Sequence, residues 1–166
     1  MVEIIMAKLV VVADLVVAGF GQFDGRLGWF KEGKDERWTE TIIAQGAGWV
    51  SAAIHDFDGD GDQDVMALKA QTWPSWRLYL NDGTGQFKER ILRKDMPGVG
   101  YNGMELGDLN QDGWLDVVLI SGDNMDLRPP PVKQTHGLRF FLGGPNAQFK
   151  ETLFVPMPGA LRARIS

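Results

Sequence analysis

Short segments rich in β-branched and aromatic residues alternate along the chain with turns rich in Gly, Asp, Asn and Pro. Helical periodicity is scarce, and several segments alternate apolar with polar side chains, which is typical of half-buried strands. The predicted strands are 14–18, 27–30, 38–42, 65–68, 77–80, 87–91, 117–120, 139–142 and 149–153. This pattern predicts an all-β protein with short strands and tight turns.

The order of strands and turns recurs with a period of about 50 residues, which is typical of a β-propeller blade of four antiparallel strands. Even the Met-Pro-Gly junction at 96–98 returns at 157–159. About three blades are expected in a single propeller segment, so the propeller is either partial or completed by oligomerisation. The predicted blades are 1–45, 46–96 and 97–156, and 157–166 is predicted to begin a next or closing strand.

Two Asp-rich loops, 56–64 and 108–116, share the pattern D-x-[DN]-x-D-G-x-x-D and each leads into an apolar segment. Oxygen ligands at positions 1, 3, 5 and 9, a carbonyl at position 7 and glycine at position 6 allow a short loop to surround Ca²⁺. Carboxylates this close together repel one another unless a cation neutralises them. An Asp/Gly-rich surface turn is the alternative, and its recurrence in the same context disfavours it.

Calcium loops that lead into helices do not fit this sequence. An EF-hand needs a bidentate Glu at position 12, where the two loops have Ala67 and Leu119. A strand-like segment follows each loop, which also excludes dockerin-type loops. The pattern therefore predicts two calcium sites in a β context, and the first blade, which has no carboxylate before Asp14 in the corresponding place, is predicted to bind none.

Composition narrows the class of protein. The 166 residues suffice for one domain with a core, and the net charge of −5 with no basic patch argues against nucleic-acid binding. Cysteine is absent, which excludes disulfides and thiol chemistry. Residues 1–20 are apolar but interrupted by Glu3, Lys8 and Asp14, so they fit neither a signal peptide nor a membrane-inserted helix, and we expect buried strands there.

The two loops and the strands that follow them resemble FG-GAP/VCBS repeats, the calcium-loop blades of integrin α-chain propellers and of many bacterial secreted or surface proteins. The resemblance implies a propeller with calcium held between the first two strands of a blade. It also implies the ligands: Asp56, Asp58, Asp60 and Asp64 with the Asp62 carbonyl, and Asp108, Asn110, Asp112 and Asp116 with the Trp114 carbonyl.

The chain begins with a blade that has no recognisable first strand and ends with the start of another strand. One hypothesis is a homo-oligomer, in which the C-terminal strand of one copy completes the first blade of a partner. The alternatives are that 1–5 form that strand, or that the chain is a fragment of a longer protein, which we favour.

Candidate ligand contacts lie outside the calcium loops. The third blade carries a longer connection, within 123–137, that contains Arg128 and His136. Trp73 and Trp76 flank a proline and are a candidate aromatic platform, although packing in the core is favoured for them, as it is for Trp29 and Trp38.

No catalytic motif stands out, and calcium already accounts for the carboxylate clusters. The favoured function is a calcium-binding propeller module for extracellular recognition or adhesion of a protein or glycan. The alternatives are a fragment of a lyase-type carbohydrate-active enzyme and a purely structural repeat module. Because weak calcium sites fill only at extracellular calcium levels, we expect a secreted, periplasmic or surface protein.

Overall fold

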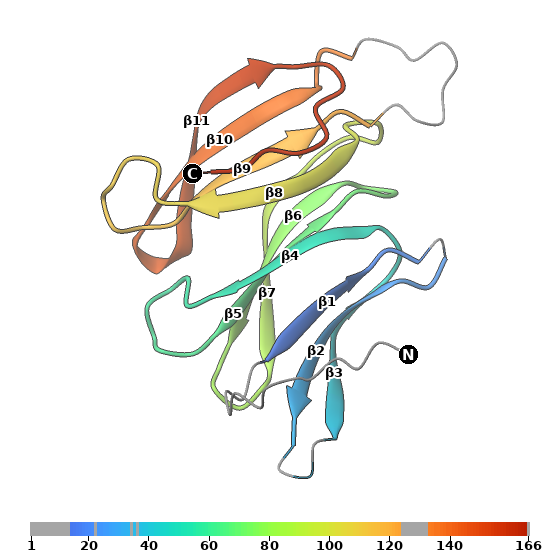
Figure 1. The fold of residues 1–166 in the computed structure, drawn as a ribbon, viewed down its shortest axis with the longest axis vertical. Helices are drawn as coiled ribbons and strands as arrows, with labels where there is room; N and C mark the ends of the chain where they lie inside the picture. Colours follow the sequence, from blue (N-terminus) through green and yellow to red (C-terminus); the bar gives the residue numbers. More distant parts are fainter. Residues whose placement is uncertain (1–13, 22, 34, 36, 124–132, 166) are drawn as a thin grey trace, which may run out of the picture.

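The computed structural model describes residues 14–165 apart from 22, 34, 36 and 124–132. Within these residues the chain forms strands and one short 3₁₀ turn, with no helix long and apolar enough to cross a membrane (Figure 1). The strands are β1 (Leu15–Gly19), β2 (Arg26–Glu32), β3 (Trp38–Gln45), β4 (Trp49–His55), β5 (Asp64–Lys69), β6 (Ser75–Asn81), β7 (Phe87–Lys94), β8 (Tyr101–Gly107), β9 (Asp116–Ser121), β10 (Gly137–Gly144) and β11 (Gln148–Pro156), and the 3₁₀ turn is η1 (Pro145–Ala147).

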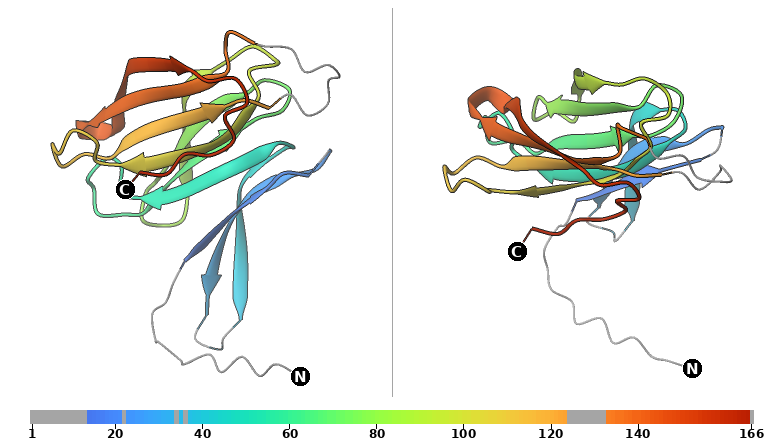
Figure 2. Two further views of the ribbon diagram at one scale, coloured as in Figure 1. Left: turned by 45° about the horizontal axis from the view of Figure 1, so that its top comes forward. Right: turned by 90° about the horizontal axis from the view of Figure 1, so that it is seen from above.

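The strands form three antiparallel sheets, each built from neighbours in sequence. Sheet 1 has the order β1-β2-β3, sheet 2 the order β4-β5-β6-β7 and sheet 3 the order β8-β9-β10-β11. Figures 1 and 2 show the sheets following one another through the molecule, as consecutive blades do. The predicted all-β fold of propeller blades is confirmed, while the predicted blade limits and the strand start at 157–166 stay predictions.

Apolar cores between the sheets explain the continuous apolar run 65–68. Successive side chains of a strand point to opposite faces, and β5 is covered on both. Val65 and Ala67 pack with Leu27 and Trp29 of sheet 1. Their neighbours Met66 and Leu68 join the second core, with Trp76 and Leu78 of β6 and with Val117, Leu119 and Phe141 of sheet 3.

Strand register corrects one equivalence suggested by sequence spacing. Trp29 follows Asp14 by the same 15 residues that separate Tyr79 from Asp64. In the structure, however, Tyr79 pairs with Val65, and the corresponding pair in sheet 1 is Leu15 with Phe30. Trp29 therefore lies on the opposite face of its sheet, where it is 2% exposed in the core toward sheet 2. Its prediction as a core residue is confirmed, although it is not the counterpart of Tyr79.

Two expectations about buried residues are wrong for the residues that the structure describes. Trp38 is 49% exposed, because it begins the outermost strand of sheet 1 on the face turned away from sheet 2. Leu15 and Val17 lie in a strand as predicted, but they are 51% and 41% exposed. Residues 1–13, including the proposed strand 1–5, lie outside the described residues.

Candidate metal centre

Both Asp-rich loops connect the first two strands of a four-stranded sheet. The first joins β4 to β5, with His55 paired to Asp64, and the second joins β8 to β9, with Gly107 paired to Asp116. Figure 1 shows the two hairpin ends on the same side of the molecule. The last Asp of each loop is thus also the first residue of a central strand, which ties the loop to the sheet.

The ninth residue of each loop is a fully buried carboxylate held by two backbone amides. Asp64 accepts hydrogen bonds from Phe57 N–H (2.9 Å) and Asn81 N–H (2.9 Å). In the second loop, Asp116 accepts from Leu109 N–H at 2.7 Å and from Gly143 N–H at 2.8 Å. Each carboxylate therefore joins the start of its loop to the end of the third strand of its sheet.

The first residue of each loop organises the turn. Asp56 accepts from Gly59 N–H (2.8 Å), Asp60 N–H (3.2 Å) and Gly61 N–H (3.0 Å). The equivalent Asp108 accepts from the amides of residues 112 and 113, at 3.1 and 2.9 Å. Two of the three bonds, those from the amides of positions 5 and 6, recur in the second loop, so the loops share much of their backbone conformation.

Positive φ angles explain the glycine at position 6. Gly61 has a φ of 97° and Gly113 one of 93°, in a region that residues with a Cβ rarely adopt. Nothing lies within 4 Å of the place where a Cβ would stand at either residue, so backbone conformation rather than crowding requires glycine. Position 4 is also left-handed in both loops, at Gly59 (83°) and Gln111 (60°).

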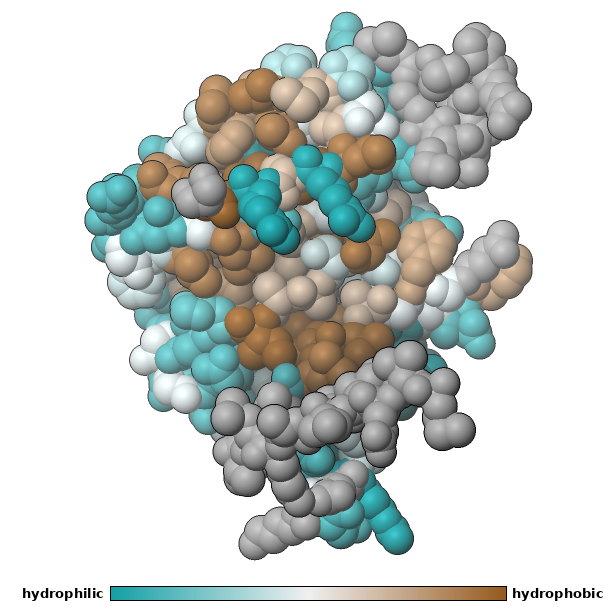
Figure 3. Space-filling view, in the orientation of Figure 1, coloured by the Kyte–Doolittle hydropathy of each residue, from teal (hydrophilic) through white to brown (hydrophobic). Residues whose placement is uncertain are grey.

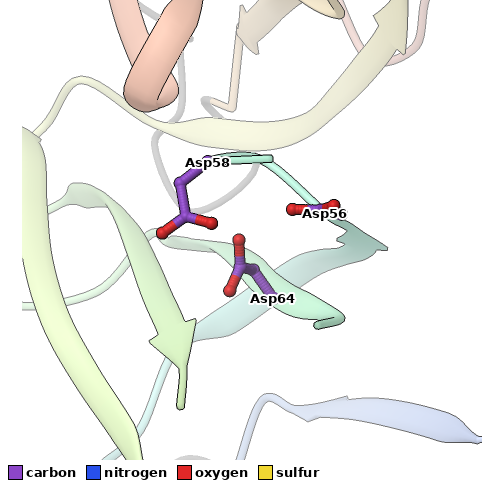
Figure 4. Close-up of side chains that lie close together, drawn as sticks. All are labelled: Asp56, Asp58 and Asp64. Carbon is purple, nitrogen blue, oxygen red and sulfur yellow. The ribbon is translucent and has the colours of Figure 1, made fainter. Parts of the chain in front are cut away.

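Three carboxylates of the first loop gather around one point. Ligand atoms of Asp56, Asp58 and Asp64 all lie within 4.8 Å of one another, and Figure 4 shows the side chains turned toward each other at the hairpin. Oxygen ligands about 2.3–2.6 Å from a calcium ion lie up to about 5 Å apart, so the spacing fits this cation. Asp60 Oδ1 is engaged by Asp62 N–H at 2.9 Å, which orients the Asp60 carboxylate within the same turn.

The second loop has the same scaffold but a different set of side chains. Asn110 replaces an acidic ligand, and its Nδ2 donates to Asp112 Oδ2 at 2.8 Å. Among the described residues, a cluster of three acidic or histidine ligands forms in the first loop and not in this one. Asp112 Oδ1 accepts from Trp114 N–H at 2.9 Å, as Asp60 accepts from Asp62. The second loop therefore offers fewer charges for the same backbone.

Burial affects the charge of the first cluster. Removal from water raises the pKa of Asp64, while hydrogen bonds from the Asn81 and Phe57 amides act in the opposite direction. The carboxylates of Asp58 and Asp60 raise it further by repulsion. A bound divalent cation would relieve both the burial cost and the repulsion, which is consistent with a cation site.

The two loops meet at a small cavity of about 90 Å³. His55, Asp56 and Phe57 line it from the first loop, and Gly113, Trp114 and Leu115 line it from the second, together with Gly144 and Phe149. The rings of His55 and Phe57 meet edge to face at 5.3 Å, and Trp114 is 38% exposed. His55 is the last residue of β4.

The two tryptophans proposed as an aromatic platform are separated by the fold. Trp76 is 1% exposed, and its ring packs against Phe141 at 4.8 Å and Phe149 at 5.0 Å. Trp73 is 50% exposed, with the Lys94 ammonium 5.0 Å from its ring centroid. The platform is wrong because Trp76 fills the core between sheets 2 and 3, leaving Trp73 alone at the surface.

The candidate contacts of the long connection are not a surface site in the described residues. His136 is fully buried, and neither ring nitrogen has a hydrogen-bond partner. Burial lowers its pKa, and the nearby Lys133 acts in the same direction. A ring that is buried in this way does not contact a ligand from solvent. Arg128 lies outside the described residues.

Sequence reasoning missed the residues that hold the buried carboxylates from the third strand. Asn81 and Gly143 supply these backbone amides, and both lie at turns that the sequence does indicate. Asn81 also donates from Nδ2 to the Gln63 carbonyl at 3.1 Å, which braces the end of the first loop. The signal was the same turn position after the third strand in both blades, but spacing does not reveal that its amide points at the loop.

Comparison with protein families gives one match. The model of the FG-GAP-like repeat matches residues 12–67 and 68–119, which together cover more than half of the chain. Each matched repeat contains one Asp-rich loop and ends in the strand that follows it. A search of curated proteins found no match.

Proposed function

Because the chain belongs to the FG-GAP-like repeat family, we propose that it is a calcium-binding β-propeller module whose metal ions stabilise the blades for extracellular recognition or adhesion. The observation that carries the proposal is the gathering of Asp56, Asp58 and Asp64 within 4.8 Å on a loop conformation that recurs in the next blade. Two unrelated surface turns have no reason to share such a network of bonds.

The residues that would hold calcium come from both loops. In the first, the carboxylates of Asp56, Asp58, Asp60 and Asp64 and the carbonyl of Asp62 offer oxygen atoms; in the second, the carboxylates of Asp108, Asp112 and Asp116, the amide oxygen of Asn110 and the carbonyl of Trp114 do so. The ion supplies positive charge to a turn of repelling carboxylates. The second site carries one acidic residue fewer among these side chains, so we expect it to bind calcium more weakly.

Recognition is assigned to the module's surface rather than to a catalytic centre. The carboxylates that could act as acid and base are engaged by backbone amides within the loops. A lyase fragment and a structural module without a ligand remain the alternatives. The proposed setting is secreted, periplasmic or surface-bound, where calcium on the order of 10⁻³ M fills weak sites.

Assembly is part of the proposal. The consecutive blades offer a surface to a protein or glycan ligand. The further blades that a ring needs come from the rest of a longer protein, as the sequence favours, or from a second copy of this chain. Propellers have at least four blades, and the described residues contain three blade-like sheets.

Calcium titration followed by thermal unfolding tests the metal part. A ligand that binds only the folded state raises stability by about 2.7 kcal/mol at 100 times its Kd. We expect the melting temperature to rise between EDTA and millimolar calcium, and the rise to shrink in Asp58→Asn and in Asp112→Asn. Identical melting curves in EDTA and calcium would refute the metal role. Binding of the calcium-loaded protein to a glycan array separates glycan recognition from protein adhesion.

A further inference from the structure

One face of sheet 1 carries the side chains that form interfaces elsewhere in the molecule. The apolar side chains of this outer face, on the side away from sheet 2, are Leu15, Val17, Phe30, Trp38 and Ile42, and the same face also carries the Arg26–Glu40 ion pair. The pair Leu15 and Phe30 corresponds in register to the pair Val65 and Tyr79 in sheet 2. It also corresponds to the pair Val117 and Phe141 in sheet 3. In sheets 2 and 3, that face packs against the preceding sheet.

Exposure at the equivalent inner positions differs sharply between the sheets. Leu15 is 51% exposed, whereas Val65 and Val117 are both at 0%. Val17 is 41% exposed, and its counterparts Ala67 and Leu119 are at 0%. Figure 3 shows hydrophobic residues gathered where Figure 1 draws β1. The β1 part of this face thus has the apolar composition of an interface between sheets, but no described sheet packs on it.

The outermost strands do not show this difference. Ile42 of β3 is 47% exposed, and its counterpart Ile91 of β7 is 49% exposed although a sheet lies next to it. Exposure at the rim is therefore ordinary in this fold. The difference between the sheets is confined to β1 and the aromatic residues, and Ile91 provides a matched control position.

Aromatic rings make contacts between neighbouring sheets. Phe87 of sheet 2 packs on Trp29 of sheet 1 at 5.2 Å, and Phe149 of sheet 3 packs on Trp76 of sheet 2 at 5.0 Å. Trp38 occupies in β3 the position that Phe87 occupies in β7 and Phe149 in β11. All three lie at the beginning of the last strand of their sheet. Within the described part of the chain, Trp38 makes no ring contact, although the two phenylalanines at its position each pack on an aromatic ring of the preceding sheet.

The far end of the same chain presents such a sheet. Sheet 3 turns Val118, Ile120, Leu138 and Phe140 away from sheet 2, at the positions that Met66, Leu68, Trp76 and Leu78, in that order, occupy in sheet 2. Leu138 and Phe140 are only half-buried, whereas Trp76 and Leu78 are 1% and 0% exposed; Val118 and Ile120 beside them are already buried, at 3% and 2%. The β10 part of this face therefore matches the outer face of sheet 1 as the two sides of each internal interface match.

The backbone pairing matches as well. Among the described residues, β1 pairs with β2 alone, whereas its counterparts β5 and β9 each pair on both sides. Residues 160–165 lie along β8: Asn102 Nδ2 donates to the Ala160 carbonyl at 2.6 Å, and a methyl at Gly107 would lie 2.9 Å from Ile165 Cγ2. Gly159 has a φ of 80° and comes just before this segment. Gly46 and Gly98, which also have positive φ angles, come just before β4 and β8, the first strands of sheets 2 and 3.

We propose that a second copy of this chain docks its sheet 3 on the outer face of sheet 1, with residues 160–165 of that copy pairing with the edge of β1 that no described strand occupies. This inference rests on the assembly part of the proposed function and is independent of calcium. The contact is heterologous, so it either closes into a ring or continues as a filament. Two copies that dock reciprocally bring six blades, which lies within the usual range of about four to eight.

Sedimentation velocity of the 166-residue chain at fixed calcium, over a range of protein concentrations, tests the proposal. We expect a dimer. Val17→Lys places a charge on the outer face of sheet 1. Because Val17 is exposed in the single chain, the variant still folds, and we expect it to be monomeric because the charge would be buried in the dimer. Ile91→Lys introduces the same charge at a site of similar exposure away from both docking faces, and it leaves the dimer intact. Circular dichroism in calcium verifies that both variants are folded.

Mixing two variants gives a second test that does not depend on either one alone. Phe140→Lys blocks the opposite face, so it is monomeric by itself, and a mixture with Val17→Lys restores one unmodified contact and forms a heterodimer. A wild-type chain that stays monomeric at all concentrations, its β1 edge covered by residues 1–13 of its own chain, overturns the inference. A dimer that survives Val17→Lys, or that Ile91→Lys dissociates equally, overturns it too. A monomer that still melts higher in calcium leaves the proposed metal role standing.

Discussion

Two carboxylates of the first loop should respond differently to the same substitution. Asp64 is fully buried and accepts two backbone amides at 2.9 Å each, while Asp58 is half-buried and accepts one, from Asp60 N–H at 3.3 Å. Both carboxylates belong to the cluster within 4.8 Å. Asp64 is thus a structural anchor and a candidate ligand, whereas Asp58 is chiefly a candidate ligand. Asp→Asn substitution at each separates the two roles.

The magnitudes follow from these contacts. In Asp64→Asn, one oxygen remains as an acceptor while the new amide group faces a buried N–H donor, and an unsatisfied buried donor costs about 1–3 kcal/mol. Loss of the charge-assisted bond adds to this, so we expect the free energy of unfolding in EDTA to fall by about 3 kcal/mol. For a chain of this size, that lowers the melting temperature by roughly 5–10 °C. Asp58→Asn keeps its acceptor, and its stability in EDTA changes by less than about 0.5 kcal/mol.

Chemical denaturation in EDTA and in saturating calcium measures both effects. Calcium should raise the stability of either variant by less than that of wild type, because each variant loses a charged oxygen of the first site. Asp24→Asn removes the same charge at an exposed turn outside the loops and serves as the control. Equal losses for Asp58→Asn and Asp64→Asn in EDTA would contradict the anchor role, and an undiminished calcium gain in Asp58→Asn would contradict the ligand role.

Three further predictions concern the loop backbone, the core and the second site. Gly61→Ala should cost about 1–2 kcal/mol in unfolding experiments, because its φ of 97° is unfavourable for a residue with a Cβ while the space around it is open. Trp76→Ala should cost about 3–5 kcal/mol in denaturant titrations, whereas Trp73→Ala at the surface should cost less than about 1 kcal/mol. Tb³⁺ luminescence excited through tryptophan should fall in Trp114→Phe, and undiminished luminescence would argue against an ion in the second loop.

Interactions between sheets 2 and 3 show why calcium is expected to act on more than a single hairpin. Arg93 of β7 contacts Asp95 at 2.8 Å and also Glu151 of β11 at 2.9 Å, and Arg139 approaches the other oxygen of Glu151 at 2.8 Å. These pairs are partly exposed and each contributes little. The apolar core between sheets 2 and 3 is the larger link, so we expect loss of order in one loop to affect the neighbouring blade.

Much of the fold could be predicted from the sequence, because its determinants are local. Aromatic and apolar residues between turns indicate strands at 77–80 and 139–142, and the run 65–68 has the composition of a strand covered on both faces. The Asp and Gly spacing of the two loops indicates one turn conformation, since each position is set by a residue type that the backbone requires there. The recurrence of these signals identifies the family without reference to any contact.

Contacts between distant residues could not be predicted in the same way. Whether Trp38 or Trp76 is buried depends on which face of a strand meets another sheet, and a shift of one residue in register reverses the answer, as Trp29 and Phe30 show. The amides of Asn81 and Gly143 reach the buried carboxylates only because the third strand ends beside the loop. Sequence by itself therefore determined the strands, the turns and the metal-binding pattern through local chemistry. Only the tertiary structure decided which apolar faces are covered, because coverage depends on how whole sheets are placed against one another.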